Sequence, residues 1–139
     1  MCCLNIIHVN LPHINLDAFY WKPNWTETSK EEWKIISNEL ADKDKWVMDG
    51  TYNSTLDYRL TKADTIIYLD YPTATCLWRV VKRTWKHHAK VRPHMADGCK
   101  ERWNLDFLHY VLIYNLTRRK MLLNKIGAYT SQKDVYNKP

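Results

Sequence analysis

Glycine is scarce in this 139-residue sequence, which contains only Gly50, Gly98 and Gly127. A glycine-rich phosphate-binding loop needs the pattern G-x-x-x-x-G-K-[ST], in which backbone N–H groups, a lysine and a hydroxyl hold phosphates and magnesium. No segment of the sequence has this pattern. This excludes the common cradle for nucleotide phosphates, although aspartates at predicted strand ends, such as Asp49 and Asp70, are typical of enzymes that handle phosphates.

Long apolar runs and a cysteine framework are also absent. No run approaches the roughly 18 apolar residues of a membrane-spanning helix, and the first ten residues lack the basic region of a signal peptide. The four cysteines include the adjacent Cys2 and Cys3 and show no convincing disulfide spacing. We therefore expect a cytoplasmic protein with reduced thiols and no membrane association.

Charge is distributed unevenly between the two halves of the chain. Residues 1–72 contain seven Lys or Arg and eleven Asp or Glu, a net charge of −4, whereas residues 73–139 contain fourteen and four, a net charge of +10. The basic half indicates a polyanionic partner, either nucleotide phosphates or nucleic acid, or else an ordinary solvated basic face. Seven Trp and nine Tyr favour a folded chain, which we expect to form a single domain over residues 1–139.

Predicted strands and helices alternate along the chain. Trp46–Met48 and Thr65–Leu69 are predicted strands. Thr28 and Ser29 each precede a glutamate by three residues, which predicts a capped helix. Its buried stripe is expected to be Trp33, Ile36 and Leu40. This alternation predicts an α/β fold, a parallel sheet flanked by helices.

The segment from residue 74 to about residue 86 repeats with helical period and carries a basic stripe. Arg79, Lys82, Arg83 and Lys86 follow at offsets of 0, 3, 4 and 7. Like charges one turn apart repel, so this stripe favours a bound anion. Another face is predicted to be apolar and buried, and it consists of Cys76, Leu77, Val80, Val81, Thr84 and Trp85. Asn104 is expected to cap a long helix over residues 105–126, and residues 87–102 are predicted to form a lid-like loop.

Five segments carry a resemblance to a known family. They are LDAFYWKPNW, WVMDGTYNSTLDYRL, ADTIIYLDYP, LWRVVKR and RPHMADGCKE, and they cover most of the span from Leu16 to Glu101. In these segments the chain resembles the adenylate-kinase-related P-loop proteins called topology modulation proteins, which are members of the P-loop NTPase superfamily. The resemblance implies a nucleoside-monophosphate-kinase-like fold with ATP and Mg²⁺ as cofactors.

The resemblance also implies roles for three residues of the acidic half. Asp49 matches the acidic residue that orients Mg²⁺ through water, and Asp17 and Arg59 match positions that face the phosphoryl acceptor. The alternatives are that Asp49-Gly50 only begins a turn and that Arg59 only pairs with a nearby acid, Asp57 or Asp64. Asp70 is expected to be a turn or cap residue rather than a ligand.

The basic half receives corresponding roles from the same resemblance. Arg79 would lie near the donor base or phosphates, Arg83 nearer the phosphates, and Arg92 would be the arginine of the closing lid. Guanidinium groups suit these roles because they can bind two phosphate oxygens at once. A zinc site in the lid is not expected, because the sequence lacks C-x-x-C; its candidate ligands would be His87, His88, His94 and Cys99.

The chain departs from the family where the phosphate loop should be. The loop should precede the segment LPHINLD, but only residues 1–10 lie before that segment, so we expect a truncated member without the first strand–loop–helix unit and without the last strand. A genuine truncation and a gene-model artefact would give the same sequence. Leu4–Val9 could supply a substitute strand; otherwise exposed sheet edges would favour self-association.

Two functional hypotheses follow. The first is a nucleotide-binding protein of phosphoryl-transfer ancestry, with kinase activity weak or absent because three arginines cannot replace a whole phosphate cradle. The alternative is a non-enzymatic basic module that binds DNA and modulates its topology, which the charge of the second half and the name of the family suggest.

Overall fold

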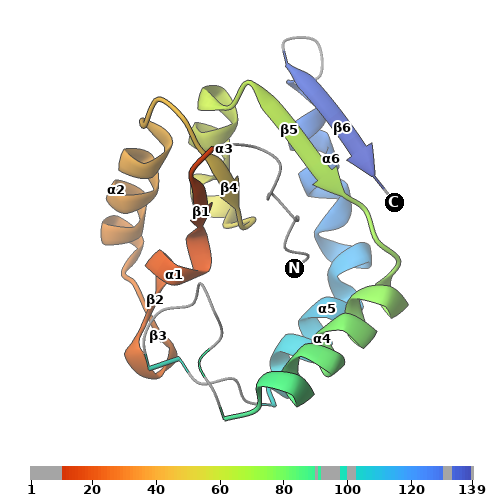
Figure 1. Cartoon of the computed structure of the whole chain (residues 1–139). Coiled ribbons are helices and arrows are strands. Elements are labelled where there is room, and N and C mark those ends of the chain that lie inside the picture. Colours follow the sequence, from red (N-terminus) through yellow and green to blue (C-terminus); the bar gives the residue numbers. More distant parts are fainter. Residues whose placement is uncertain (1–10, 90, 92–97, 100–102, 130–132, 139) are drawn as a thin grey trace. The chain divides into compact units, whose positions relative to one another are not determined.

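The computed structural model describes residues 11–89, 91, 98–99, 103–129 and 133–138 (Figure 1). The described residues belong to two compact units. The first contains the described residues up to Lys62 together with 91, 98 and 99, and the second contains Ala63–Ala89 and the described residues from 103 onward. The expectation of a single domain stays a prediction.

The first unit is built on a short pair of parallel strands. Strand β1 (His13–Asn15) pairs with β4 (Val47–Asp49), with His13 opposite Val47 and Asn15 opposite Asp49. The other elements of this unit are α1 (Leu16–Tyr20), the antiparallel pair β2 (Trp21–Lys22) and β3 (Thr26–Glu27) with the 3₁₀ turn η2 (Pro23–Trp25) between them, α2 (Lys30–Ala41) and α3 (Asn53–Lys62).

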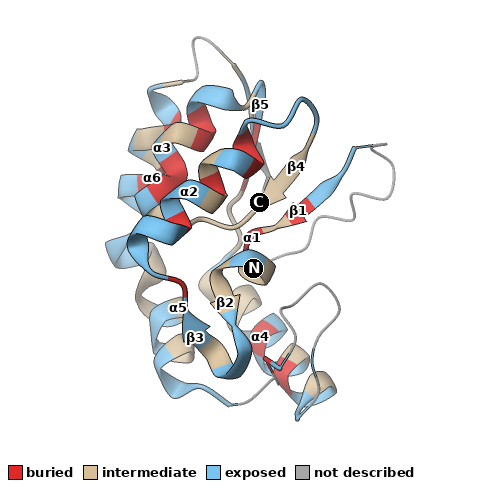
Figure 2. Ribbon diagram, turned by 90° about the vertical axis from the view of Figure 1, so that its left-hand side faces the viewer, coloured by how far each residue is buried: buried red, intermediate tan, exposed pale blue. Residues whose placement is uncertain are grey.

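Helix α2 begins as its sequence predicts. The Ser29 hydroxyl accepts a hydrogen bond from the backbone N–H of Glu32 at 3.2 Å, which satisfies one of the first unpaired donors of the helix. Trp33 and Leu40 are buried on the predicted stripe, and Ile36 is half-buried beside them. Figure 2 shows buried positions along one side of α2 and α3 and exposed positions along the other. The Ser29 cap therefore sets the start of α2, and the apolar stripe sets the face that the helix buries.

Aromatic side chains form much of the core of the first unit. Ile14, Leu16, Trp33 and Leu40 are buried together. The rings of Tyr20, Trp33 and Tyr52 pack against one another with centroid separations of 5.1, 4.6 and 4.8 Å. Edge and tilted contacts of this kind add stabilisation beyond burial alone.

The second unit contains another parallel pair and three helices. Strand β5 (Thr65–Leu69) pairs with β6 (Asp134–Lys138), and the helices are α4 (Thr73–His87), α5 (Leu105–Thr117) and α6 (Arg119–Gly127). The Asn104 side chain accepts from the backbone N–H of Phe107 at 3.0 Å, which confirms the predicted cap. The single long helix predicted after it is wrong, because the helix breaks at Arg118, where φ is −110°. Helix α4 packs against α5, and α5 against α6.

The predicted α/β fold, with helices flanking one parallel sheet, is wrong. The described strands form three separate two-stranded sheets, two parallel and one antiparallel, and helices dominate both units. Strands β1 and β4 have only three residues each, and Gly50 ends β4 with a φ of 121°. The predicted absence of a last strand is also wrong, since β6 pairs with β5 along all five of its residues.

Several expectations fall on residues outside the described set. The substitute strand Leu4–Val9 and most of the predicted lid, 87–102, are among them. Within the described part of the chain, no helix is long and apolar enough to cross a membrane, and the longest, α4, has 15 residues.

Candidate functional site

Two carboxylates, Asp17 and Asp49, lie where β1 and β4 end, close enough for the charge of Asp17 to act on Asp49. Asp49 is the last residue of β4, and Asp17 lies in the first turn of α1, where its backbone N–H donates to the Asn15 side chain at 3.0 Å. The Nε2 atom of His13 lies 3.5 Å from Oδ1 of Asp49. We call His13, Asp17, Asp49 and Tyr52 the carboxylate site.

The surroundings of Asp49 change the pKa of its carboxyl group. Burial raises the pKa of the Asp49 carboxyl; His13 opposes the shift and the negative charge of Asp17 adds to it. A cation that binds beside a buried carboxyl group stabilises its ionised form. The site therefore has an excess of negative charge that a divalent ion could balance.

Tyr52 holds Asp17 in place. Its hydroxyl donates to Oδ1 of Asp17 at 2.6 Å, while its ring packs against Tyr20 and Trp33. Burial, followed by the charge of Asp17, raises the pKa of Tyr52, so the phenol remains a donor at physiological pH. The orientation of Asp17 is thus fixed by the aromatic core.

Arg59 organises the loop between β4 and α3. The side chain is 6% exposed, and its Nη1 donates to Gly50 O at 2.9 Å while Nη2 donates to Thr51 O at 2.5 Å and Tyr52 O at 3.2 Å. Burial lowers the pKa of Arg59 to about 10, so it stays charged at neutral pH. These bonds give it a positioning role beneath Tyr52. Its role toward a phosphoryl acceptor stays a prediction.

Gly50 allows β4 to end close to α1. Its φ is 121°, and a Cβ added there would lie 2.9 Å from Cβ of Leu16. A side chain at this position would be strained by its backbone conformation and would also collide with the core. The pair Asp49-Gly50 therefore combines a polar strand end with a close backbone approach.

The donors of the carboxylate site fit one kind of metal. In the described segments, no group of three or more His, Cys, Asp or Glu could hold a metal ion. Mg²⁺ commonly uses only one or two carboxylates and retains several waters, which Asp17 and Asp49 can accommodate.

Of the candidate zinc ligands, Cys99 is buried and its thiol donates to Lys22 O at 3.3 Å, and His94 lies outside the described residues.

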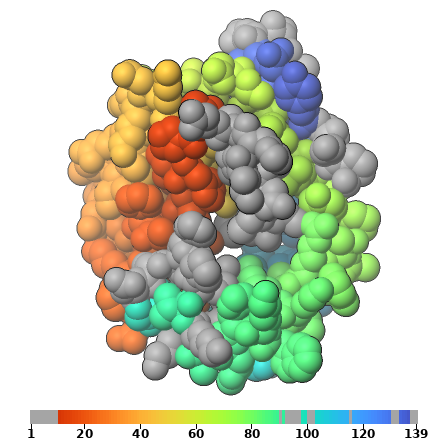
Figure 3. Space-filling view, in the orientation of Figure 1, coloured from red at the N-terminus to blue at the C-terminus, as the bar shows by residue number. Residues whose placement is uncertain are grey.

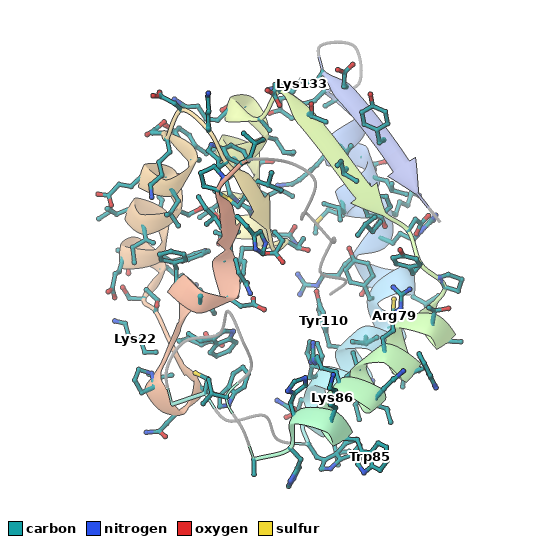
Figure 4. All side chains as sticks on the ribbon, viewed as in Figure 1. Lys22, Arg79, Trp85, Lys86, Tyr110 and Lys133 are labelled. Atoms are coloured by element: carbon teal, nitrogen blue, oxygen red, sulfur yellow. The ribbon has the colours of Figure 1, made fainter. Side chains whose placement is uncertain are left out.

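The basic stripe lies on α4, in the second unit. Arg79, Lys82 and Lys86 are exposed and Arg83 is half-buried. The Arg79 guanidinium lies 4.2 Å from the Tyr71 ring centroid, and that of Arg83 lies 5.7 Å from Phe107 (Figure 4 labels Arg79 and Lys86). The structure thus places these four basic residues on one helix. Arg92 lies outside the described residues, so its lid role stays a prediction.

The predicted buried face of α4 needs a correction. Val80 and Thr84 are buried, but Val81 is 42% exposed and Trp85 is 79% exposed. In an ideal helix Val81 lies about 80° and Trp85 about 120° from the middle of the Val80–Thr84 stripe, so neither belongs to the buried face. The helical period was therefore right and the width of its buried face was wrong.

Asp70 is used within the second unit. Arg119 binds it with two nitrogens: Nε donates to Oδ1 at 2.9 Å, and Nη2 pairs with Oδ2. The bond from Arg119 lowers the pKa of Asp70. Asp70 is therefore an ion-pair residue that ties the end of β5 to α6, rather than the turn or cap residue that its sequence suggested.

Two members of the carboxylate site were missed by sequence reasoning. His13 and Asn15 alternate along β1, a spacing that places both side chains on one face of the strand. Tyr52 lies two residues after Gly50, where the sequence gave no signal for its return toward Asp17. The alternation along the strand could have pointed to His13, whereas nothing in the sequence could have pointed to Tyr52.

Comparison with known proteins gives a distant match. The chain is similar to the uncharacterised protein YqaC of Bacillus subtilis (strain 168), with 25% identity over 109 residues. The match covers 76% of this chain and 60% of that protein, so the chain spans less than two thirds of the relative's length. No family model and no solved structure matches. The name of this relative states no activity, so the match assigns no function to the chain. The resemblance to topology modulation proteins stays a hypothesis.

Proposed function

We propose that this protein binds a nucleotide, with ATP and Mg²⁺ as the reference ligands, and that its phosphoryl-transfer activity is weak or absent. The observation that carries the proposal is the approach of Asp17 and Asp49 at the ends of β1 and β4. These are the two acids that the resemblance assigns to the acceptor and to magnesium. Their shared negative charge and the raised pKa of Asp49 support a cation-binding role.

The chemistry of the carboxylate site can be stated in terms of its own residues. Asp49 would hold the hydrated ion, and Asp17, oriented by Tyr52, would contribute the second carboxylate. When bound, Mg²⁺ would neutralise phosphate charge. Arg59 keeps the 50–52 loop in the conformation that presents Tyr52 to Asp17.

The α4 stripe supports anion binding independently. Arg79 and Arg83 lie one turn apart, and each guanidinium rests on an aromatic ring, Tyr71 and Phe107 respectively. A ring contact restricts the conformations of a guanidinium, which lowers the conformational entropy lost when the group binds phosphate oxygens. Such a stripe on a single helix supports weak binding, of the order of 1 mM or about −4 kcal/mol.

The test is calorimetric titration of the full chain with ATP in the presence and absence of Mg²⁺. We expect weak binding that Mg²⁺ strengthens, loss of the Mg²⁺ effect in Asp49→Asn, and loss of binding in Arg83→Ala. Asp44→Asn and Lys120→Ala remove exposed charges elsewhere and should behave like the parent. A parent protein that binds ATP equally with and without Mg²⁺, or does not bind it, would contradict the proposal.

Catalysis is tested separately, by phosphate release and transfer from ATP with common nucleosides and monophosphates as acceptors. We expect turnover near background because the chain has no glycine-rich cradle. Rapid turnover that disappears in Asp49→Asn would show that the carboxylate site supports a full kinase and would overturn the second half of the proposal.

A further inference from the structure

Two tryptophans of α4 are exposed to solvent. Trp78 is 61% exposed and Trp85 is 79% exposed. They are seven residues apart, which is two helical turns, so their rings lie on the same side of α4 about 10 Å apart along its axis. Figure 4 shows the Trp85 side chain extending outward from the last turn of α4, and Figure 3 shows α4 contributing to the molecular surface.

Lysines share this face with the indole rings. The ammonium of Lys82 lies 4.7 Å from the centroid of the Trp78 ring, and Lys86 is exposed next to Trp85. Helix α4 has four Lys or Arg residues and no acidic residue. We call Trp78, Lys82, Trp85 and Lys86 the aromatic–basic face. It lies away from the Val80–Thr84 stripe, which is the buried side of α4.

The mixture of rings and charges discriminates between anionic partners. A helix that lies in a membrane surface separates its apolar face from its basic face, and it inserts the apolar one. In α4 the main apolar stripe is already buried, while each exposed ring has a lysine within about one turn. Duplex nucleic acid offers phosphates but keeps its base faces stacked, whereas a single strand offers both phosphates and free base faces.

We propose that the aromatic–basic face of α4 binds single-stranded nucleic acid. Bases stack on Trp78 and Trp85, and phosphates contact Lys82 and Lys86. Binding of this kind depends little on sequence, because every base has a π-face, and it weakens as salt rises. The proposal uses neither Asp49 nor Arg83, and it shares only Lys82 and Lys86 with the basic stripe described above.

The test is fluorescence anisotropy of a labelled 12-nucleotide oligothymidylate titrated with the full chain. Each of Trp78→Ala and Trp85→Ala should weaken binding about 5- to 100-fold, the range expected for loss of one stacked base. Trp85→Tyr should retain part of the affinity because tyrosine keeps a stacking face. Trp103→Ala is the matched control, since Trp103 is 49% exposed outside α4 and should not matter.

The lysines are tested through salt dependence. The double variant Lys82→Ala/Lys86→Ala should reduce the slope of log affinity against log salt by about 1.4, because two fewer phosphates are neutralised on a single strand. Lys120→Ala should leave the slope unchanged. Equal slopes for the parent and the double variant would contradict the assignment of phosphates to these lysines.

Competing ligands complete the test. An oligouridylate, a blunt duplex of the same length and vesicles of phosphatidylserine and phosphatidylcholine are compared with the oligothymidylate. Tighter binding of either single strand than of the duplex, with no vesicle binding, supports the proposal and shows which of the two strands is preferred. Preference for duplex or vesicles, or equal losses in Trp85→Ala and Trp103→Ala, would overturn it. Arg83→Ala distinguishes the two proposals, because it should abolish ATP binding and leave the oligonucleotide bound.

Discussion

The carboxylate site of the first unit and the aromatic–basic face of the second use polar groups in opposite ways. In the first unit, Tyr52 binds Asp17 and Arg59 binds three backbone carbonyls, so these polar groups serve one another inside the fold. In the second unit, Trp85 and Lys86 extend from α4 into solvent. The carboxylate site forms only when several elements of the first unit fold together, whereas the aromatic–basic face needs only the helix α4.

This difference has an energetic consequence. Removing a buried polar group leaves its partners without hydrogen bonds and costs the free energy of their desolvation. Removing an exposed side chain changes the stability of the fold by less than about 0.5 kcal/mol in most cases. Substitutions in the first unit should therefore change stability and binding together, and those on the α4 face should change binding alone.

The largest effect should come from Arg59→Met. Methionine fills similar space but leaves the carbonyls of Gly50, Thr51 and Tyr52 without their donor, so we expect a loss of about 3 kcal/mol in the free energy of unfolding. Urea denaturation followed by circular dichroism measures this loss. Arg118→Met, which removes an exposed arginine, is the control and should change stability little. Similar losses in both variants would remove the contrast between inward and outward polar groups.

Gly50→Ala should be the next most damaging change. The added methyl would lie 2.9 Å from Cβ of Leu16, on a backbone with φ of 121°, so we expect about 2 kcal/mol of destabilisation. Thermal melting compares it with Gly127→Ala, where no atom lies within 4 Å of the added carbon. Since Gly127 is helical, its replacement should be neutral or slightly stabilising. Equal melting temperatures for Gly50→Ala and the parent would show that β4 and α1 are not held this closely.

Local features of the fold could be predicted from the sequence, and long-range ones could not. The caps Ser29 and Asn104 act on residues only three positions away, and both were predicted correctly. Pairing of β5 with β6 joins segments separated by more than 60 residues, and the polar tail gave no local signal for it. The prediction of a single sheet was wrong because the sequence does not show how far a pair of strands extends. The parallel pair of β1 and β4 forms from three residues in each strand and does not join a larger sheet.

The candidate sites show the same limit. The family resemblance selects Asp17 and Asp49, and only Asp49 also lies at a predicted strand end; in the structure the charge of Asp17 acts on Asp49. Arg59 was assigned to a ligand or a neighbouring acid, because nothing in its sequence shows that the chain from Gly50 to Tyr52 turns its carbonyls toward it. Helical period located Trp85 on α4, but the area that α5 covers is a property of two helices and cannot be read from one.

A smaller and pH-dependent effect is expected for Asp49→Asn. The pKa of Asp49 is raised in the folded state, so the folded protein takes up the proton at a higher pH than the unfolded chain and loses stability as the pH rises through that interval. Asparagine cannot ionise, so the variant should melt a few degrees higher than the parent at pH 7. The advantage should vanish below about pH 4, where the unfolded carboxyl is also protonated. Asp44→Asn, at an exposed position, should show no such trend, and a difference that is constant with pH would contradict the assignment.

The smallest effect on stability should come from Trp85→Ala, although this change is expected to have a large effect on binding. The indole is 79% exposed, so its removal uncovers little apolar surface and leaves no cavity. The melting temperature should remain within about 2 °C of the parent, in line with a change below 0.5 kcal/mol. Loss of oligonucleotide binding in a variant of unchanged stability would separate the α4 face from the fold that carries it. A loss of more than about 1 kcal/mol would show instead that Trp85 packs against another part of the protein in solution, and that its ring is not available to a base.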